Sequence, residues 1–333
     1  MEENKIRLLA LDSKLANLAI LRIAQYYINL GIDVGWYEHL FDYEDTDILY
    51  ISKIFTFTDD VINLPINARI IKGGTGYDVL SKLPIEMESI TDIKEAYELL
   101  YPEIDYSILF TTRGCVRKCP FCVVPLKEGM IHSVNTTTLN PNGTYIELLD
   151  NNFFSGRDWE KRFNYVQSLN QPINFNTGLD CRSITEEQAK VLGELNIKAI
   201  HIAWDNLEEE QAVFNGIERM IKYVSPSKIT CYVLVGFKQP EIIASDLYRV
   251  RKLHEYKITP FAMGYIDFDN PKQERSESVK HFQRYVNKHI FKTVSWDEYG
   301  NKFDIERLNQ TTIYDFIDTN EAHNGLAGKE ERE

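Results

Sequence analysis

The 333-residue sequence has no long apolar run, and glycine and proline are too scarce for a fibrous or low-complexity chain. No window approaches the about 18 consecutive apolar residues of a membrane-spanning helix, so we expect no membrane span. The opening Met-Glu-Glu-Asn also lacks the basic and then apolar pattern of a secretory signal. These absences favour a cytoplasmic protein.

Basic residues are in deficit: 37 Lys and Arg face 50 Asp and Glu, which gives a formal net charge of −13. Proteins bind nucleic acid chiefly through cationic contacts to phosphates. The charge balance therefore disfavours long nucleic acid as a partner. The basic residues that flank Cys115, Cys119 and Cys122 would still form a local basic rim suited to a small phosphate-bearing ligand. The length suggests about two domains.

Residues 1–114 contain no cysteine, whereas three of the five cysteines lie within eight residues, at Cys115, Cys119 and Cys122. In an intracellular chain, clustered thiols favour a metal site over disulfides. The C-x3-C-x2-C spacing follows a predicted strand, where α/β folds gather their functional loops. Thiolates are soft ligands that suit iron–sulfur clusters and zinc.

The residues around these cysteines leave alternatives open. A structural zinc site needs a fourth ligand, which His132 would supply, and a redox dithiol is a further reading. The flanking cations Arg113, Arg117 and Lys118 are expected to offset the thiolates' charge and to lower the pKa values of the thiols.

Apolar runs alternate with helical patterns along the chain, which predicts an α/β protein. Residues 1–105 read as a Rossmann-like domain and connector, with a helix that begins after Asn17 and is closed by Gly31. From residue 106 six further strand and helix units fit a partial (β/α)6 barrel over residues 106–295, and residues 296–333 read as an extension with a frayed polar tail. The predicted strands are 6–11, 34–37, 48–55 and 70–71 in the first domain, and 107–111, 145–149, 173–175, 199–203, 229–235 and 261–266 in the second.

The cysteine spacing, with the aromatic Phe121 just before the third cysteine, resembles the motif of the radical S-adenosylmethionine (SAM) superfamily. That resemblance implies a [4Fe–4S] cluster held by Cys115, Cys119 and Cys122, with its open iron bound by SAM. A reducing partner such as flavodoxin or ferredoxin would deliver an electron, and SAM would be cleaved to a 5′-deoxyadenosyl radical that abstracts hydrogen from an unidentified substrate. Peptide, nucleoside and small-metabolite substrates all stay open.

The resemblance also implies SAM contacts at the carboxyl ends of the barrel strands. Asp150 and Asn152 are candidates for the methionyl amine, Arg182 for the carboxylate with Asp180 orienting it, Asp205 for the ribose, and Gly236 for the adenine. Each has an alternative as an ordinary turn residue or a loop salt bridge. No catalytic residue is assigned.

The order of the two domains is similar to that of radical SAM proteins with a cobalamin-binding domain, whose fingerprint runs D-x-H-x-x-G, S-x-L and G-G. The counterparts here begin at Asp12, Ser52 and Gly73, but Lys14 replaces the ligand histidine and Asn17 the glycine. A protonated lysine is no metal ligand, which disfavours cobalamin. A cobalamin-dependent methyltransferase is the alternative enzyme, and a zinc-stabilised binding module is the alternative of another class.

Overall fold

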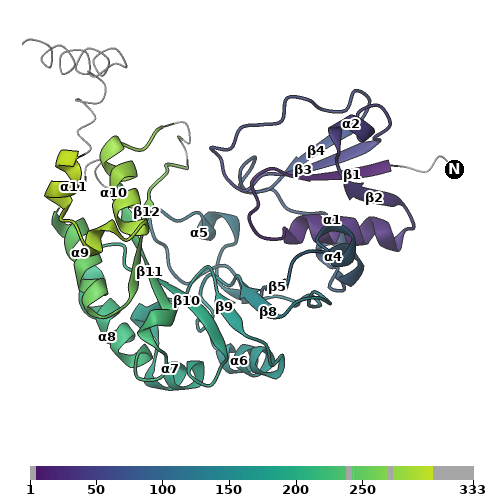
Figure 1. The fold of residues 1–333 in the computed structure, drawn as a ribbon. Coiled ribbons are helices and arrows are strands. Elements are labelled where there is room, and N and C mark those ends of the chain that lie inside the picture. The colour runs from purple at the N-terminus through teal and green to yellow at the C-terminus, as the bar shows by residue number, and fades with distance from the viewer. Residues whose placement is uncertain (1–4, 238–241, 243, 269, 271–272, 303–333) are drawn as a thin grey trace, which may run out of the picture.

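The computed structural model describes residues 5–237, 242, 244–268, 270 and 273–302 (Figure 1). It shows an α/β chain with a four-stranded and a six-stranded parallel sheet and one small antiparallel pair. The extension predicted beyond residue 302, with its polar tail, lies outside these described residues. None of the described helices is both long and apolar enough to cross a membrane.

The first sheet has the strand order β2-β1-β3-β4, compatible with a Rossmann-like fold. Its strands are β1 (Lys5–Ala10), β2 (Asp33–Trp36), β3 (Ile48–Ser52) and β4 (Arg69–Gly73). The helices α1 (Leu18–Asn29), α3 (Ile85–Glu88) and α4 (Lys94–Leu100) pack together beside this sheet, where Ile6 and Leu8 join their apolar core.

Helix α1 begins and ends where the sequence predicts. The Asn17 side chain accepts hydrogen bonds from the backbone N–H groups of Ala19 and Ile20, as an N-cap does. Gly31 follows the helix with a φ of +68°, a left-handed conformation that favours glycine. Strand β3, by contrast, ends at Ser52 rather than at residue 55. The Lys53 N–H still donates to the Gly73 carbonyl, but the Asp12 carboxylate accepts from the N–H groups of Ile54 and Phe55 and so diverts them from the sheet.

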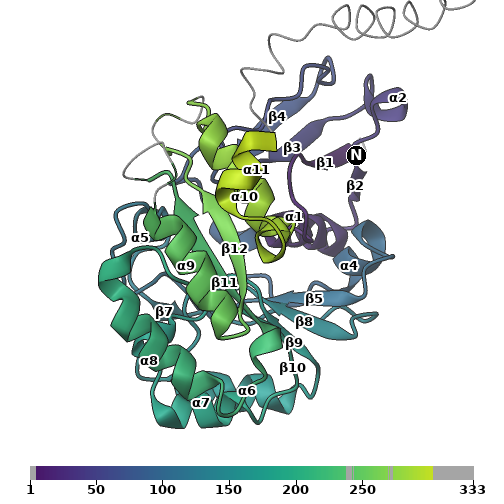
Figure 2. The ribbon, with the colours of Figure 1, turned by 60° about the vertical axis from the view of Figure 1, so that its left-hand side comes forward.

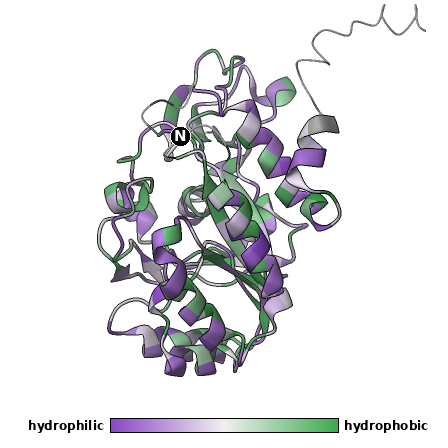
Figure 3. Ribbon diagram, turned by 90° about the vertical axis from the view of Figure 1, so that its left-hand side faces the viewer, coloured by the Kyte–Doolittle hydropathy of each residue, from purple (hydrophilic) through white to green (hydrophobic). Residues whose placement is uncertain are grey.

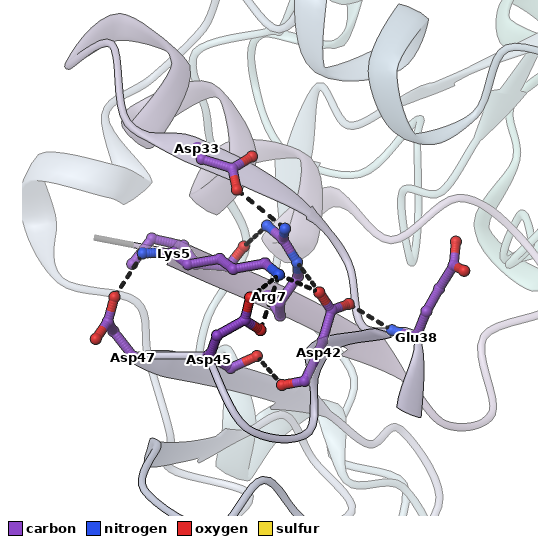
Figure 4. Close-up of polar contacts among 9 residues, drawn as sticks. Lys5, Arg7, Asp33, Glu38, Asp42, Asp45 and Asp47 are labelled. Carbon is purple, nitrogen blue, oxygen red and sulfur yellow. Dashed lines mark hydrogen bonds and ion pairs between the residues drawn. The ribbon is translucent and has the colours of Figure 1, made fainter. Parts of the chain in front are cut away.

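An ion cluster fixes the short helix α2 (His39–Asp42) to the amino end of β1 (Figure 4). Asp42 is buried and accepts from Arg7 Nε at 3.0 Å and from the Glu38 N–H at 2.8 Å, with Lys5 Nζ 2.8 Å away. Burial opposes ionisation of Asp42, but these hydrogen bonds outweigh it and lower the pKa of the carboxyl. The cluster lies at the sheet edge opposite the carboxyl ends of the strands.

The second sheet has all six strands in chain order, β5-β8-β9-β10-β11-β12. They are β5 (Tyr106–Leu109), β8 (Tyr145–Leu148), β9 (Ile173–Phe175), β10 (Ile197–Ala203), β11 (Ile229–Val235) and β12 (Thr259–Gly264). Strands β9 and β11 match their predicted bounds, and all six predicted strands are confirmed with shifts of one or two residues elsewhere.

Helices cover one face of this sheet, as Figures 1 and 2 show. They are α6 (Trp159–Ser168), α7 (Glu186–Leu192), α8 (Glu210–Met220), α9 (Ala244–Glu255) and α10 (Glu277–Asn287). Parallel strands in chain order with same-handed connections place the helices on one side. In Figure 3 the strands are largely green, whereas the helices carry purple positions. The last described helix, α11 (Trp296–Lys302), adds Trp296 and Tyr299 to this core.

The two sheets are joined around β5. The Tyr97 hydroxyl of α4 accepts from the Ile108 N–H at 3.0 Å, and the Tyr106 hydroxyl accepts from the Ala16 N–H at 3.0 Å. Ile108 is buried in the core of the first unit. The first unit is therefore anchored to the first strand of the second sheet.

Candidate functional site

The three clustered cysteines lie in a loop that follows β5. Strands β6 (Thr112–Arg113) and β7 (His132–Ser133) pair antiparallel and close the base of this loop, which also carries α5 (Val124–Lys127). Gly114 has a φ of +78°, and a Cβ there would lie 2.5 Å from the Met130 carbonyl oxygen. Only glycine therefore fits where the two sides of the cysteine loop approach each other.

The three thiols of this loop are free and close enough to affect one another. Cys115 and Cys119 are half-buried and Cys122 is exposed. Desolvation raises the pKa values of Cys119 and Cys122, and the neighbouring thiols raise them further. The expectation that flanking cations lower the pKa values of these two thiols is wrong.

The thiols lack this stabilisation because the two flanking arginines form ion pairs with carboxylates instead. Arg113 pairs with Glu128 at 2.7 Å and Arg117 with Asp180 at 2.6 Å, while Lys118 is exposed. Within the described part of the chain, no three His, Cys, Asp or Glu side chains are arranged to hold a metal ion. The donor chemistry of the loop, three unpaired soft thiols, nevertheless fits an iron–sulfur cluster with one open iron.

The remaining candidate ligands are less available. Cys181 and Cys231 are buried in the core beneath the helices. His132 is exposed, and its Nδ1 donates to the Met130 carbonyl at 3.0 Å, which leaves only Nε2 for a metal.

Phe121 ties the cysteine loop to the far side of the second sheet. Its ring meets Phe237 edge-on at 5.5 Å between centroids, and Phe237 meets Tyr265 at 4.9 Å. Phe237 follows β11 and Tyr265 follows β12, so the aromatic row spans two strand ends. Gly236, just before Phe237, has a φ of +80° and turns the chain at this edge.

Asp150 holds the start of the cysteine loop rather than facing solvent. Its carboxylate accepts from the Thr111 N–H at 2.7 Å, the Thr112 N–H at 3.1 Å and the Thr111 hydroxyl, and burial raises its pKa. Asn152 is likewise buried, and its Nδ2 has no hydrogen-bond partner within the described structure. Asp150 thus positions the loop, whereas Asn152 keeps a free amide donor nearby.

Asp180 and Arg182 form an ion network at the carboxyl end of β9. Arg182 Nε donates to Asp180 at 2.6 Å, and Arg182 Nη1 donates to both oxygens of Glu209 at 2.7 Å. Burial opposes the charge of Arg182, but these carboxylates outweigh it and raise its pKa. Because Arg117 also donates to Asp180, the network fastens the cysteine loop to β9.

Asp205 follows β10 at the same edge, next to this network. Burial raises the pKa of its carboxyl to about 6, although Arg182 and Arg249 act in the opposite direction. Arg249 Nη1 donates to the backbone carbonyls of Trp204 and Asp205 and so fixes the end of β10.

Sequence reasoning missed Glu128 and Glu209. Glu128 accepts from the Gly114 N–H at 2.8 Å and from Asn151 Nδ2 at 2.7 Å, besides pairing with Arg113. Both glutamates act through partners distant in sequence, and a lone glutamate in a polar segment carries no local signal of such a role.

Several of the cobalamin-like residues of the first unit take part in hydrogen bonds within that unit. The Asp12 carboxylate, besides its two backbone contacts, accepts from the Thr58 hydroxyl at 2.7 Å, and Asn17 Nδ2 donates to the Ser13 and Ser52 hydroxyls. A Cβ at Gly74 would lie 2.4 Å from the Lys53 carbonyl oxygen, and one at Gly76 would lie 2.7 Å from Lys53 Cγ. The glycine turn therefore packs against the chain after β3.

No family model matches the chain, and no curated protein matches it either. The fold and the site define an α/β protein that carries a loop with three thiols at the carboxyl edge of a six-stranded parallel sheet.

The short 3-10 helix Cys181–Ser183, which carries Arg182, depends on a glycine in α8. A Cβ at Gly216 would lie 1.8 Å from the Cys181 carbonyl oxygen. We predict that Gly216→Ala lowers stability by about 2 kcal/mol or more, because this overlap outweighs the about 1 kcal/mol that alanine gains over glycine in a helix. Gly300→Ala in α11 is the control, since nothing lies within 4 Å of its Cβ position.

Urea denaturation followed by circular dichroism measures both variants. Gly300→Ala should unfold at the same or a higher urea concentration than the wild type. A Gly216→Ala variant as stable as the wild type would contradict the close contact between α8 and Cys181.

Proposed function

We propose that the protein is a radical SAM enzyme whose second sheet forms a partial (β/α)6 barrel. The observation that carries this proposal is the loop of three free thiols directly after the first strand of a parallel sheet whose six strands follow chain order. Cys115, Cys119 and Cys122 would hold a [4Fe–4S] cluster. When bound, the cluster supplies the electron that cleaves SAM to a 5′-deoxyadenosyl radical, which abstracts hydrogen from the substrate.

The chain's own residues fix the loop at three points. Asp150 holds its first turn, Arg117 joins it to Asp180 beyond β9, and Phe121 packs on Phe237 beyond β11. Such anchoring keeps the three thiols at one edge of the sheet, where the other strand ends also arrive. A reducing partner of the flavodoxin or ferredoxin kind would be needed.

The strand ends differ in what they offer SAM. Arg182 already donates through Nε to Asp180 and through Nη1 to Glu209, so a carboxylate ligand would bind beside these two carboxylates or displace one of them. Asn152 has an unsatisfied amide donor, Asp205 has a carboxyl of raised pKa, and Gly236 turns the chain. We assign SAM binding to these three positions and a supporting, positioning role to Asp150 and Asp180.

A zinc-stabilised binding module is the second candidate, from another class. It requires a fourth ligand to close the site, and His132, whose Nδ1 donates to a backbone carbonyl, would have to bind through Nε2. We favour the cluster because three thiols that follow the first strand of a parallel sheet are a complete donor set for a cluster with one open iron.

A cobalamin-dependent methyltransferase is the other enzyme considered, and the residues present do not fit that cofactor. Lys14 stands in place of the ligand histidine, and Lys53 packs its side chain against the glycine turn with Nζ 4.3 Å from the Tyr77 ring centroid. The first unit is in our proposal a scaffold without cobalamin.

Metal analysis separates the cluster from zinc. After anaerobic reconstitution with iron and sulfide, we expect about four irons and four sulfides per wild-type chain, and a loss of most of this content in Cys119→Ala. Cys231→Ala, at a buried core thiol, is the matched control and should keep its iron. About one zinc per chain without sulfide would favour the binding module.

Equilibrium dialysis against hydroxocobalamin tests the first unit. We expect no corrinoid to be retained by the wild type, and none by Lys14→His, because the imidazole alone does not open the packed turn at Gly74 and Gly76. Retention of one corrinoid per wild-type chain would overturn the scaffold role and favour the methyltransferase.

A further inference from the structure

The face of the second sheet that the helices leave uncovered carries polar and aromatic side chains. On β8 and β9, Ile146, Leu148, Ile173 and Phe175 enter the helix-side core, so the residues between them point to the opposite face. Strand pairing sets Glu147 beside Asn174, and Tyr232 beside Phe261. These side chains lie below the strand ends that carry the candidate site.

Glu147 is a buried carboxylate without a cation. Its side chain belongs to a residue only 5% exposed, and its Oε2 accepts from Asn174 Nδ2 at 2.8 Å and from Asn176 Nδ2 at 2.7 Å. Among the residues that the structure describes, no Lys, Arg or His forms an ion pair with it. The carboxylate also interacts with the Tyr145 hydroxyl, whose pKa is raised by burial and by this carboxylate. Burial of a carboxylate is costly unless a positive charge or enough donors compensate it, and these neutral donors bring no positive charge.

The surroundings of Glu147 have more acceptors than donors. The side-chain amides of Asn174 and Asn176 both donate an N–H to the same oxygen of Glu147. The buried Oδ1 of Asn174 has no hydrogen-bond partner within the described structure. His201 donates through Nδ1 to the Phe175 carbonyl at 2.9 Å, so its Nε2 is an acceptor when the ring is neutral. A ligand that complements Glu147, Asn174 and His201 would therefore carry a positive charge and several hydrogen-bond donors.

An aromatic wall stands beside this acceptor group. The His201 ring stacks on Tyr232 at 5.2 Å, and Tyr232 meets Phe261 edge-on at 5.8 Å. Phe261 and Met263, on the same face of β12, are exposed to 37% and 43% although both are large and apolar. Such a wall suits an alkyl chain that ends in a polar head.

We propose that Glu147, held by Asn174 and Asn176, binds a primary ammonium group of the substrate, whose alkyl chain lies along His201, Tyr232 and Phe261. This inference rests on the proposed function, because it takes the uncovered face of the sheet as the substrate side. An ammonium group brings one positive charge and three donors, which matches the uncompensated carboxylate and the surplus acceptors. A neutral hydroxyl offers one donor and no charge. The shared chemistry is that of an alkylamine, either a small metabolite or the lysine side chain of a peptide.

Isothermal titration calorimetry of the reconstituted protein tests the proposal with three probes at equal ionic strength. They are pentylamine, its neutral analogue 1-pentanol, and Nα-acetyl-lysine amide for the peptide source. We expect an amine to bind the wild type at least about tenfold more tightly than the alcohol. Preference for Nα-acetyl-lysine amide over pentylamine would assign the peptide source, and the reverse order the free amine.

Glu147→Gln keeps an acceptor for the two amides but removes the charge, so it should abolish the discrimination between amine and alcohol. Glu194→Gln, at an exposed glutamate, is the matched control and should bind as the wild type does. Asn176→Ala keeps the charge and loses one amide, and we expect it to weaken amine binding about three- to tenfold. It supplies the decisive comparison if Glu147→Gln fails to fold.

Equal binding of amine and alcohol by the wild type, or unchanged discrimination in Glu147→Gln, would overturn the ammonium site. The same titration on protein without iron separates this inference from the enzyme proposal. Retained amine discrimination in a chain that assembles no cluster would refute the radical SAM function and leave the Glu147 site standing.

Discussion

The hydrogen bonds from Thr111 and Thr112 to the buried Asp150 carboxylate are the contact on which the candidate site depends. They join the segment after β5 to the end of β8, so the cysteine loop leaves the sheet in one defined direction. A buried acceptor engaged by two backbone N–H groups and a hydroxyl is costly to break, because its donors would then lack partners. The position of the three thiols therefore depends on the Asp150 side chain, which is distant from all three cysteines in the sequence.

Two further contacts extend this constraint across the sheet. The Arg117–Asp180 ion pair reaches the end of β9, and the Phe121–Phe237 contact reaches the end of β11. Glu128 closes the loop internally through Gly114 and Arg113. Arg113 and Arg117, which would otherwise stabilise thiolates, pair with carboxylates instead, and desolvation raises the pKa values of Cys119 and Cys122.

Much of the fold follows from local sequence patterns. The six strands of the second sheet are apolar runs bounded by polar turns, the Asn17 cap is confirmed, and Thr185 and Gln188, three residues apart, form a capping box at the start of α7. Strand β3 is shorter than its apolar run because Asp12, a residue distant in the chain, binds the backbone N–H groups of Ile54 and Phe55. Local patterns describe periodicity and capping, and they do not contain such long-range pairings.

The candidate site was accessible to sequence reasoning only in part. The cysteines stand out because three thiols share one short segment, whereas Glu147 sits inside an apolar strand with no neighbouring signal. For Arg182 the sequence leaves open a ligand contact and a loop salt bridge, and the structure pairs it with Asp180 and Glu209. Side-chain partners across strands are set by sheet register, which becomes visible only in three dimensions.

The most direct test of the central claim is the detection of 5′-deoxyadenosine by mass spectrometry. The reconstituted protein is incubated anaerobically with SAM and dithionite, beside the Cys119→Ala variant. A radical SAM enzyme should release 5′-deoxyadenosine and methionine only when its three cysteines are intact. Wild-type protein that carries a full cluster and yet forms no more 5′-deoxyadenosine than Cys119→Ala would contradict the account.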